Sequence, residues 1–530
     1  MKREEMLDRL AGEPFDIAII GGGATGLGIA VDASSRGYRA LLLEAHDFAQ
    51  GTSSRSTKLV HGGVRYLEQL NFSLVMEALR ERGLLYENAP HLVRNLAFVV
   101  PRFRWWEAPF YGVGLKLYDT LAGKLNLAPS RSLDRDETIE AIPNVEREGL
   151  LGGIRYSDAQ FDDARMAVTL ALSAADHGAV VLNRMPVVGF LKTDGGAGQT
   201  CGVVVRDAES GREHRILARV VINATGIFSD GLRRLDRPDA PPMTVLSQGI
   251  HLVLDASFQP SPSAIMVPHT DDGRVLFVVP WYGRVLVGTT DTPVPNAELE
   301  PRALPEEVEF VLRNAGRYMA KDPTREDVLC VFAGLRPLVQ AGKGIDSKAI
   351  SREHAVFVSN SGLVTIVGGK WTTYRKMAQD AITDAIEVGG LVPRPCVTET
   401  LRLHGWMGRD DPALTEDPAM RVYGTDAAGL EDLAREDAAW GERLHPMLPY
   451  RPAHVIWAVR HEMARSVEDV LARRTRSLLL DARASIEVAP AVAALMAREL
   501  GRDASWARRE ERAYRELARG YLLDGSDAPA

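Results

Sequence analysis

The apolar positions near the start of the chain change period three times within thirty residues. Residues 15–20 form a short run rich in isoleucine, and three glycines follow it directly. Residues 24–36 then place apolar side chains at helical spacing, Gly37 ends that pattern, and residues 39–43 form a second apolar run. This pattern is typical of a buried strand followed by a tight turn, a helix and a second buried strand. The pattern therefore predicts a βαβ unit with parallel strands.

The alternation of helices and strands continues further along the chain. The expected helices are residues 68–88 and 161–177, and the expected strands are residues 180–182, 202–205 and 215–222. The last strand runs into Asn223-Ala224-Thr225-Gly226, whose small side chains let the backbone come close to a ligand.

Residues 247–290 have a different pattern, in which short apolar runs are separated by Pro, Gly and Asp-Gly turns. This pattern predicts an antiparallel sheet that forms a second layer. Residues 304–319 are expected to be helical and residues 328–333 to form a strand. Residues 364–374 repeat the opening order of strand, glycines and helix, which predicts a second backbone surface beside the same ligand. Beyond residue 393 the chain is rich in Ala, Arg and Glu at helical spacing, most clearly over residues 433–444, 454–473 and 486–521, and this predicts an all-helical domain.

Length, charge and cysteine content limit the number of domains and the kinds of partner that the chain can have. At 530 residues the chain is too long for a single hydrophobic core, so two or three domains are expected. A formal net charge of -8 and a pI near 5.9 argue against nucleic acid as a partner. The three cysteines, Cys201, Cys330 and Cys396, match neither a metal-ligand spacing nor a disulfide framework. We therefore expect no metal site and a cytoplasmic protein.

The sequence predicts no membrane-spanning segment, because no window approaches about 18 consecutive apolar residues and the charged N-terminus is not a signal sequence. One segment allows a peripheral contact. Phe110, Val113, Leu117, Leu121 and Leu125 recur at helical spacing, with lysines between them and aromatic residues before them. Such a helix can lie in a lipid interface. Periodicity alone favours a helix that packs on its own domain.

The glycines after the first strand carry the first chemical signal. Gly21 permits the sharp turn, Gly23 lets the backbone approach a pyrophosphate, and Gly26 lets the helix pack closely on the strand. Glu44 ends the second strand at about the expected 20 residues and is positioned to accept from a ribose hydroxyl. A merely flexible loop would not sit between a strand and a helix. The motif predicts a dinucleotide site and leaves NAD and FAD open.

The next segment, GTSSRSTKLVHGGVRYLE at residues 51–68, is dense in hydroxyl and basic side chains. Thr52, Ser53 and Ser54 can donate to phosphate or to a ring edge, and Arg65 can form a fork with a phosphate or carboxylate. A solvated basic loop is the plainer interpretation. Its position beside a phosphate-binding turn favours a functional loop.

These segments together resemble the FAD-dependent glycerol-3-phosphate dehydrogenases, which share the fold of amino-acid and glycine oxidases. The resemblance spans most of the chain and is carried by IGGGATGLGIAVDASSRG, GTSSRSTKLVHGGVRYLE, DAQFDDARM, INATG, VPWYGRVLVGTTD, FAGLRPL and GGKWTTYRKMA. Leu27 departs from the pattern, because the family usually has a smaller residue there.

The resemblance implies an α/β (α+β overall) fold: a Rossmann-like FAD-binding domain, an antiparallel-sheet substrate domain over the flavin and an all-helical C-terminal cap. The corresponding boundaries are residues 1–85, 156–240 and 346–392 for the FAD-binding domain, 86–155 for a mixed segment with a possible membrane contact, 241–345 for the substrate sheet and 393–530 for the cap. It also favours FAD over NAD, since residues 223–226 and 368–370 extend the site beyond the first glycines.

The implied reaction is the oxidation of sn-glycerol 3-phosphate to dihydroxyacetone phosphate, with electrons passing to a quinone. The implied setting is a homodimer bound peripherally to the cytoplasmic face of a membrane, with the helix at residues 110–125 touching lipid. An O₂-using oxidase, or an oxidase of amino acids or 2-hydroxy acids with the same fold, is the alternative. A flavin-free binding protein is a third hypothesis, against which the intact glycines, Glu44 and the basic loop argue.

The resemblance also assigns site residues. For the substrate phosphate the candidates are Arg65, Arg336 and Arg352, helped by Tyr66, because guanidinium forks match phosphate oxygens. Lys370 can serve the substrate oxygen or the flavin. The residues expected at the cofactor are Gly21, Gly23, Gly26, Glu44, Thr52, Ser53, Ser54, Lys58, His61, Gly62, Ala224, Thr225, Gly226, Gly368, Gly369 and Lys370.

The general base is expected to be His251. An unperturbed histidine has a pKa near 6.5, and by strand alternation Ile250 and Leu252 point to the opposite face from His251. A core histidine is the plainer interpretation. Arg336 has too high a pKa to serve as the base, so it is assigned to the developing oxyanion and the phosphate, and the catalytic residues are expected to be His251, Arg336 and Lys370.

Overall fold

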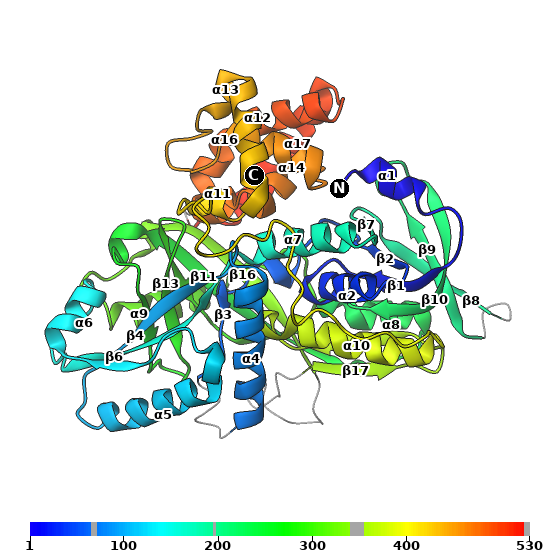
Figure 1. Cartoon of the computed structure of the whole chain (residues 1–530). Coiled ribbons are helices and arrows are strands. Elements are labelled where there is room, and N and C mark those ends of the chain that lie inside the picture. The colour runs from blue at the N-terminus through cyan, green and yellow to red at the C-terminus, as the bar shows by residue number, and fades with distance from the viewer. Residues whose placement is uncertain (65–70, 194–197, 340–353, 524–530) are drawn as a thin grey trace.

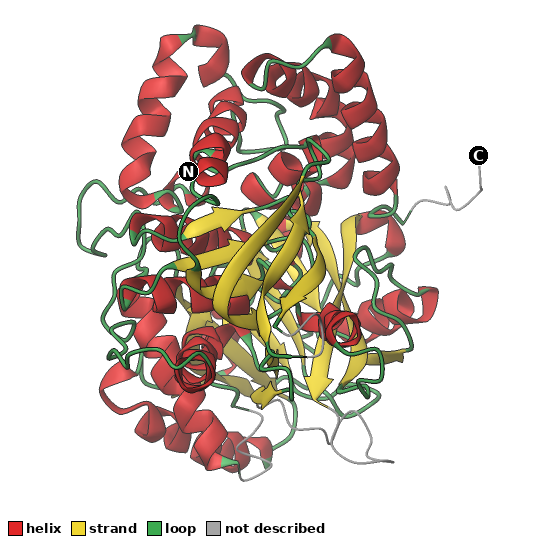
Figure 2. Cartoon of the chain, turned by 90° about the vertical axis from the view of Figure 1, so that its right-hand side faces the viewer, coloured by secondary structure: helices red, strands yellow, loops and turns green. Residues whose placement is uncertain are grey.

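The computed structural model describes residues 1–64, 71–193, 198–339 and 354–523. Two sheets form the centre of the molecule, helices flank them, and a group of helices stands above them (Figures 1 and 2). The expected fold class is confirmed.

The first sheet is built around the strand that opens the chain, β1. In the described residues its spatial order is β17-β18-β10-β1-β2-β7, with β9 extending from β10 and β8 pairing with β9. The strands are β1 (Phe15–Ile20), β2 (Ala40–Leu43), β7 (Val180–Leu182), β8 (Val187–Lys192), β9 (Thr200–Arg206), β10 (Glu213–Asn223), β17 (His354–Val358) and β18 (Val364–Gly368). From β18 to β7 each strand runs parallel to its neighbours, as a βαβ unit requires.

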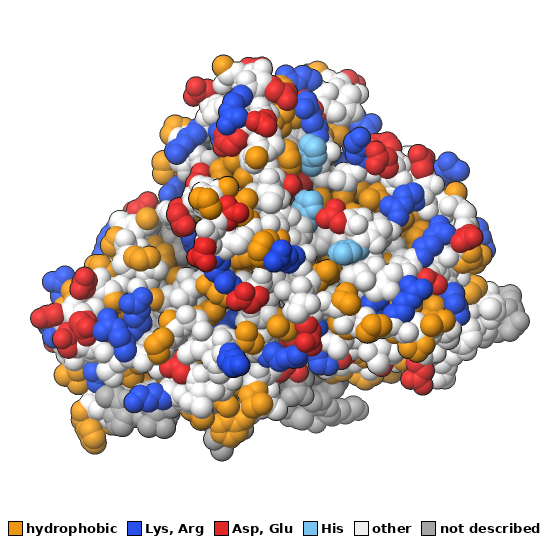
Figure 3. Space-filling view, in the orientation of Figure 1, with side chains coloured by type: hydrophobic (Ala, Val, Ile, Leu, Met, Phe, Trp, Pro, Cys, Tyr) orange, Lys and Arg blue, Asp and Glu red, His pale blue; other side chains and the backbone are white. Residues whose placement is uncertain are grey.

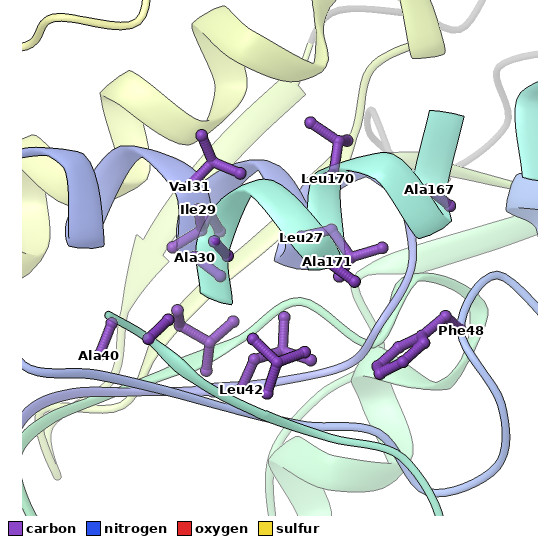
Figure 4. Close-up of a cluster of buried hydrophobic side chains, with 14 of the residues drawn as sticks. Leu27, Ile29, Ala30, Val31, Ala40, Leu42, Phe48, Ala167, Leu170 and Ala171 are labelled. Atoms are coloured by element: carbon purple, nitrogen blue, oxygen red, sulfur yellow. The ribbon is translucent and has the colours of Figure 1, made fainter. Parts of the chain in front are cut away.

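Helices α2 (Ala24–Ser35), α7 (Asp163–Asp176) and α10 (Tyr374–Val388) pack beside this sheet, and α8 (Ser229–Asp236) follows β10. Figure 4 shows how the core fills: Leu27 of α2 and Ala171 of α7 lie next to each other over Leu42 of β2. Each of these side chains is fully buried, because a parallel sheet covered on its faces has apolar residues throughout.

The second sheet is the expected antiparallel layer. In the described residues its order is β15-β11-β14-β13-β12-β4-β6-β3, with β16 beside β11 and β5 beside β6. Its strands are β3 (Leu59–Val60), β4 (Arg94–Arg102), β5 (Arg131–Leu133), β6 (Gly152–Gln160), β11 (Thr244–Asp255), β12 (Ala264–Val267), β13 (Leu276–Trp281), β14 (Arg284–Gly288), β15 (Thr292–Val294) and β16 (Val328–Val339). Helices α9 (Pro305–Gly316) and α6 (Arg135–Ala141) pack with its strands.

This sheet is larger than the sequence predicted. Residues 86–155, expected as a mixed segment, contribute β4, β5 and part of β6, and β4 pairs in parallel with β12. The pairing joins residues more than 160 positions apart, so no local pattern announces it. The end of β6 likewise belongs to this sheet and not to the first one.

Helix α5 (Glu107–Ala122) lies along the lower edge in Figure 1, and the 3-10 turn η2 (Gly123–Leu125) follows it. Helix α4 (Phe72–Asn88) stands upright in this view, with its lower end near the same edge. Leu115, Tyr118 and Ala122 bury one stripe of α5 against the domain. The helix thus packs on its own domain, as the plainer interpretation predicted, but through other residues than the apolar stripe named from the sequence. Leu117 on that helix and Trp105 just before it remain exposed. In the part of the chain described, no helix is both long and apolar enough to cross a membrane.

The helices at the top of Figure 1 come from the end of the chain. They are α11 (Pro418–Arg421), α12 (Ala427–Glu436), α13 (Ala438–Gly441), α14 (Pro452–His461), the π-helical turn η10 (Asp469–Arg474), α15 (Ser477–Leu480), α16 (Ala482–Glu499) and α17 (Ala504–Arg519). The two longest predicted helices are broken. Gly501, with φ +62°, turns the chain between α16 and α17, and Asp503 caps the second helix by accepting from the Trp506 amide at 2.8 Å.

Buried ion pairs tie these helices to the first sheet. Asp47, in the loop after β2, accepts from Arg473 at 2.6 Å and from Arg474 at 2.7 Å. Arg165 of α7 pairs with Glu462 at 2.8 Å. All of these side chains are almost completely buried, so none can lose its partner without leaving an uncompensated charge.

His404 makes a second connection between the two parts. Its Nδ1 lies 2.6 Å from Asp176 at the end of α7, and its Nε2 lies 2.9 Å from Asp426 just before α12. Burial lowers the pKa of His404, but the hydrogen bonds to the two carboxylates outweigh burial and raise the pKa from 6.5 to about 9. His404 is therefore a cation at neutral pH.

We expect the variant His404→Gln to lose stability in a pH-dependent way. A pKa raised on folding stabilises the folded state fully below 6.5, and this stabilisation is lost as the pH rises through about 9. The loss of Tm caused by the substitution should therefore be largest below pH 6.5 and smallest above about pH 9. Calorimetry over this range checks it. His445→Gln, at a histidine with a single carboxylate partner, is the control, and an equal loss of Tm for His404→Gln at both ends contradicts the prediction.

Candidate active site

A cavity of about 700 Å³ lies where the two sheets meet. The carboxyl ends of β1, β2, β10 and β18 form one wall, and β11 and β16 of the second sheet form the other. Along the first sheet the chain moves from β1 to β2 on one side and later to β10 and β18 on the other. Ligands of open parallel sheets bind at such a reversal of strand order.

The glycine turn after β1 leaves no room for side chains. A Cβ on Gly21, where φ is +112°, would lie 2.6 Å from the carbonyl oxygen of Ala224 at the end of β10. A Cβ on Gly26 would lie 1.9 Å from the carbonyl oxygen of Gly21. The turn therefore packs backbone against backbone. Gly23, just before α2, lines the cavity, and a Cβ there would lie 3.0 Å from Ser53 Oγ.

Glu44, at the end of β2, lines the same wall. One carboxylate oxygen accepts from the Gly22 amide at 2.6 Å and the other from the His46 amide at 2.8 Å. Burial raises the pKa of Glu44, and the two amide hydrogen bonds oppose this shift. A carboxylate offers about four acceptor positions, so these bonds leave capacity for a ligand hydroxyl.

The loop at residues 51–57 is fastened to three separate elements. Ser53 Oγ accepts from the Ala24 amide at 2.9 Å, and its carbonyl accepts from Trp371 Nε1 at 2.9 Å. Thr52 Oγ1 donates to the carbonyl of Leu335 in β16 at 2.6 Å. The loop is therefore a rigid floor that joins both walls of the cavity.

Most of the expected cofactor residues line this cavity: Gly21, Gly23, Glu44, Thr52, Ser53, His61, Ala224, Thr225, Gly226, Gly368, Gly369 and Lys370. Gly26, Ser54, Lys58 and Gly62 do not. Gly26 acts by helix packing and Gly62 by packing under Tyr118, whose hydroxyl accepts from its amide at 2.8 Å. Ser54 turns its carbonyl away, toward Lys58 and Arg476.

Lys58 requires the clearest correction. Its backbone has φ +62°, and its ammonium is fully buried 2.7 Å from Asp163 Oδ2, behind the loop and not in the cavity. Burial lowers the pKa of Lys58 to about 8, while Asp163 opposes the shift. The sequence gives no local sign of this contact, because Asp163 lies 105 residues later.

The opposite wall carries His251 and Arg336 on neighbouring strands, β11 and β16. His251 is 2% exposed, stacks on Phe332 with ring centres 5.0 Å apart, and lies with Nε2 2.9 Å from Thr57 Oγ1. Its Nδ1 has no hydrogen-bond partner among the described residues. Ile250 and Leu252 face the core instead, as alternation predicted.

His251 does not keep the unperturbed pKa near 6.5 that the sequence analysis used for it. Burial, Lys58 and Arg336 lower the pKa of His251 well below 6.5, so its imidazole is neutral at physiological pH. A neutral imidazole is in the right form to accept a proton, but it is a weaker base than an unperturbed one.

Arg336 lines the cavity and has two polar partners, one hydroxyl and one carboxylate. Its Nη2 lies 3.2 Å from Thr289 Oγ1 and its Nη1 lies 3.5 Å from Asp291 Oδ1. Gly249, which sequence reasoning missed, makes this possible: a Cβ there would lie 2.2 Å from Arg336 Nη2. A glycine inside a predicted strand is the signal that could have identified it. Arg65, Tyr66 and Arg352 lie outside the described residues.

Known protein families and solved structures match this chain over most of its length. Residues 16–375 match the family of FAD dependent oxidoreductases, and residues 364–507 match the C-terminal domain of alpha-glycerophosphate oxidase. A probable mitochondrial glycerol-3-phosphate dehydrogenase of Caenorhabditis elegans is 40% identical over 98% of this chain and 75% of its own length. The mitochondrial glycerol-3-phosphate dehydrogenase of Homo sapiens is 40% identical over 96% of this chain and 73% of its own.

The chain belongs to the FAD-dependent glycerol-3-phosphate dehydrogenase family. The resemblance read from the sequence is thereby confirmed. The X-ray structure of the glycerol-3-phosphate dehydrogenase from Bacillus halodurans complexed with FAD aligns with a TM-score of 0.79 and 30% identity, over 98% of this chain and 97% of that one.

FAD is the cofactor of this family, and the residues of this chain fit it. Three features form the pattern that holds a dinucleotide: the glycine turn that has no room for side chains, the helix start at Gly23 and the acidic Glu44. The cavity runs from this turn to His251 and Arg336, which gives room for a flavin ring beside a small substrate. No cluster of three or more His, Cys, Asp or Glu side chains in the described part of the chain is arranged to hold a metal.

We expect Gly26→Ala to lose FAD. The new Cβ would lie 1.9 Å from the Gly21 carbonyl, so the phosphate turn must open. Overpacking of this kind costs about 1–3 kcal/mol, which corresponds to about a 10- to 100-fold loss of affinity. The flavin content per purified chain measures it. Gly114→Ala in α5, where a Cβ meets nothing within 4 Å, is the control and should keep its flavin; equal flavin content in both variants would contradict the prediction.

Proposed function

We propose that this member of the family oxidises sn-glycerol 3-phosphate to dihydroxyacetone phosphate and passes the electrons to a respiratory quinone. The proposal rests on one observation: His251, Arg336 and Lys370 line the same cavity as the dinucleotide turn. The names of the relatives support the substrate. Arg336 and Lys370 both line the cavity, and two cations suit a phosphate dianion better than a carboxylate.

Bound FAD supplies the hydride acceptor, and the chain supplies position and charge. Arg336 binds the phosphate or the developing oxyanion through its fork, which Thr289 and Asp291 hold from behind. His251 accepts the proton of the C2 hydroxyl, since it lines the cavity and its imidazole is neutral. Lys370 follows β18 and adds positive charge at the cofactor side of the cavity.

On the cofactor side, we propose that the glycine turn holds the pyrophosphate, Glu44 the ribose, and the returns at residues 224–226 and 368–370 the rest of the dinucleotide. The loop at residues 51–57 joins this half to the wall that carries Arg336. Its hydrogen bonds to both walls keep the two halves in a fixed geometry, which is what positioning of a reactive carbon requires.

Anaerobic mixing of the purified flavoprotein with glycerol 3-phosphate tests the proposal. Bleaching of the flavin absorbance is the expected result, and reoxidation by a quinone analogue but not by air distinguishes a dehydrogenase from an O₂-using oxidase. Arg336→Lys keeps the charge and loses the fork. Hydrogen bonds to charged groups contribute about 1.5–3 kcal/mol, so the substrate Kd should rise about 10- to 100-fold with FAD still bound. An unchanged Kd removes Arg336 from the substrate site, and flavin that glycerol 3-phosphate never bleaches refutes the activity.

We further propose that the edge formed by α4 and α5 rests on a membrane, and that the active form is a homodimer. Trp105 is 80% exposed and Leu117 37%, with Phe72 and Met76 exposed on α4. Figure 3 shows hydrophobic side chains along this lower edge. An exposed aromatic and aliphatic edge of this kind is typical of proteins that lie on a lipid interface.

The double variant Trp105→Glu/Leu117→Glu should bind anionic vesicles at least about 10-fold less than the parent, because even partial burial of a Trp and a Leu side chain in lipid contributes more than about 1.4 kcal/mol. Co-sedimentation with vesicles measures the bound fraction. Met447→Glu, at an exposed apolar residue of the C-terminal helices, serves as the control. If both variants sediment like the parent, this edge is not the membrane contact.

A further inference from the structure

We propose that Thr57 is a positioning residue for His251, and that Asp163 together with Arg476 of the C-terminal helices holds Thr57 in place. The inference rests on the proposed role of His251 as the base. It assigns a catalytic purpose to a contact between the C-terminal helices and the active-site loop.

Thr57 contacts the base directly. Its hydroxyl lies 2.9 Å from His251 Nε2, and both residues line the cavity. Phe332 covers one face of the imidazole, and a Cβ on Gly288 would lie 2.3 Å from its Cδ2. The ring is thus held in its plane by packing, and the Thr57 hydroxyl is the hydrogen bond that fixes which nitrogen is engaged.

A single carboxylate oxygen fixes the residues on both sides of Thr57. Asp163 Oδ2 accepts from the Ser56 amide at 3.0 Å, from Ser56 Oγ at 2.7 Å and from Lys58 Nζ at 2.7 Å. Because Thr57 lies between Ser56 and Lys58, these three bonds hold both of its neighbours in the chain. Lys58 adopts a left-handed backbone, which a non-glycine residue keeps only where its surroundings hold it.

Arg476 completes this unit from the C-terminal helices. Its Nη2 donates to Asp163 Oδ1 at 3.0 Å and to the Ser54 carbonyl at 2.9 Å, and Lys58 Nζ donates to the same carbonyl at 2.8 Å. Arg476 is 1% exposed and has φ +59°. One guanidinium from the end of the chain therefore touches both the carboxylate and the loop that position Thr57.

The charges of this unit balance, which explains why it can be buried. Asp162, the N-cap of α7, lies 3.5 Å from Arg476 Nε, so two carboxylates face one ammonium and one guanidinium. A balanced cluster is costly to leave incomplete, since removing one member leaves a buried charge without a partner. The C-terminal helices must therefore be docked for Thr57 to be held.

The first test removes the Thr57 hydroxyl without changing its shape. In anaerobic stopped-flow mixing with glycerol 3-phosphate, Thr57→Val should reduce its flavin about 10- to 100-fold more slowly, a part of what general-base catalysis contributes. The substrate Kd should stay near that of the parent, and Thr57→Ser should recover most of the rate. The rate is measured per bound flavin, so loss of folded protein alone leaves it unchanged. A parental rate in Thr57→Val overturns the proposal, and so does a rise in Kd that fully accounts for the effect.

The second test compares two arginines of the same segment. Arg476→Lys loses the fork to Asp163 and Ser54, while Arg474→Lys loses a fork of equal burial to Asp47. Small misplacements of catalytic groups cost up to about 100-fold, and only Arg476→Lys should slow flavin reduction. Equal effects in both variants overturn the link to the C-terminal helices.

If Arg476→Lys does not fold, Ser56→Ala takes its place, because it removes one donor to Asp163 Oδ2 and leaves every buried charge paired. A smaller slowing is then expected, and a parental rate in Ser56→Ala overturns the link through Asp163. A parent enzyme whose flavin glycerol 3-phosphate does not bleach refutes the proposed function itself, so the two failures are distinguishable.

Discussion

The molecule depends on buried charges that are complete only when its distant parts are together. Asp47 and Asp163 lie beside the first sheet, and their partners Arg473, Arg474 and Arg476 come from one turn near the end of the chain. The effective penalty for burying an ion is several kcal/mol, and it is recovered only when geometry and hydrogen bonds are good. The C-terminal helices are therefore not an appendage. Their docking also neutralises Asp163, the carboxylate that holds Ser56 and Lys58 of the active-site loop.

The two halves of the cavity are built on different principles. The cofactor half is made of backbone: the turns at Gly21 and Ala224 touch, and no side chain fits between them. The substrate half is made of charged and polar side chains on two adjacent strands, with Gly249 giving space to the guanidinium of Arg336. Backbone contacts suit a cofactor that is common to a whole family, whereas side chains on strands can be exchanged without disturbing the fold. The loop at residues 51–57 joins the halves.

This division also explains what could be predicted from the sequence. The first strand, its turn, α2 and Glu44 follow from local spacing, because a βαβ unit is specified within about 30 residues. Arg336 and His251 were found through motifs and strand alternation. Lys58 was assigned to the cofactor only through the family resemblance, and its buried contact with Asp163 places it behind the loop instead. The strand β4 was missed for the same reason: it pairs with β12, far along the chain, and long-range pairing has no local pattern.

The electrostatics of the substrate half follow from the same buried charges. Lys58 lies behind the loop and Arg336 lies in the cavity, and together with burial both lower the pKa of His251. A base made weak by neighbouring cations is strengthened when an anion offsets them, since an opposite charge nearby favours the protonated imidazole. The proposed substrate carries a phosphate dianion to Arg336. Its binding would therefore raise the proton affinity of His251 at the moment when the C2 hydroxyl is in place, so the charge that anchors the substrate also prepares the base. The neutral histidine of the free site and the proposed binding of phosphate at Arg336 are then two consequences of one charge arrangement.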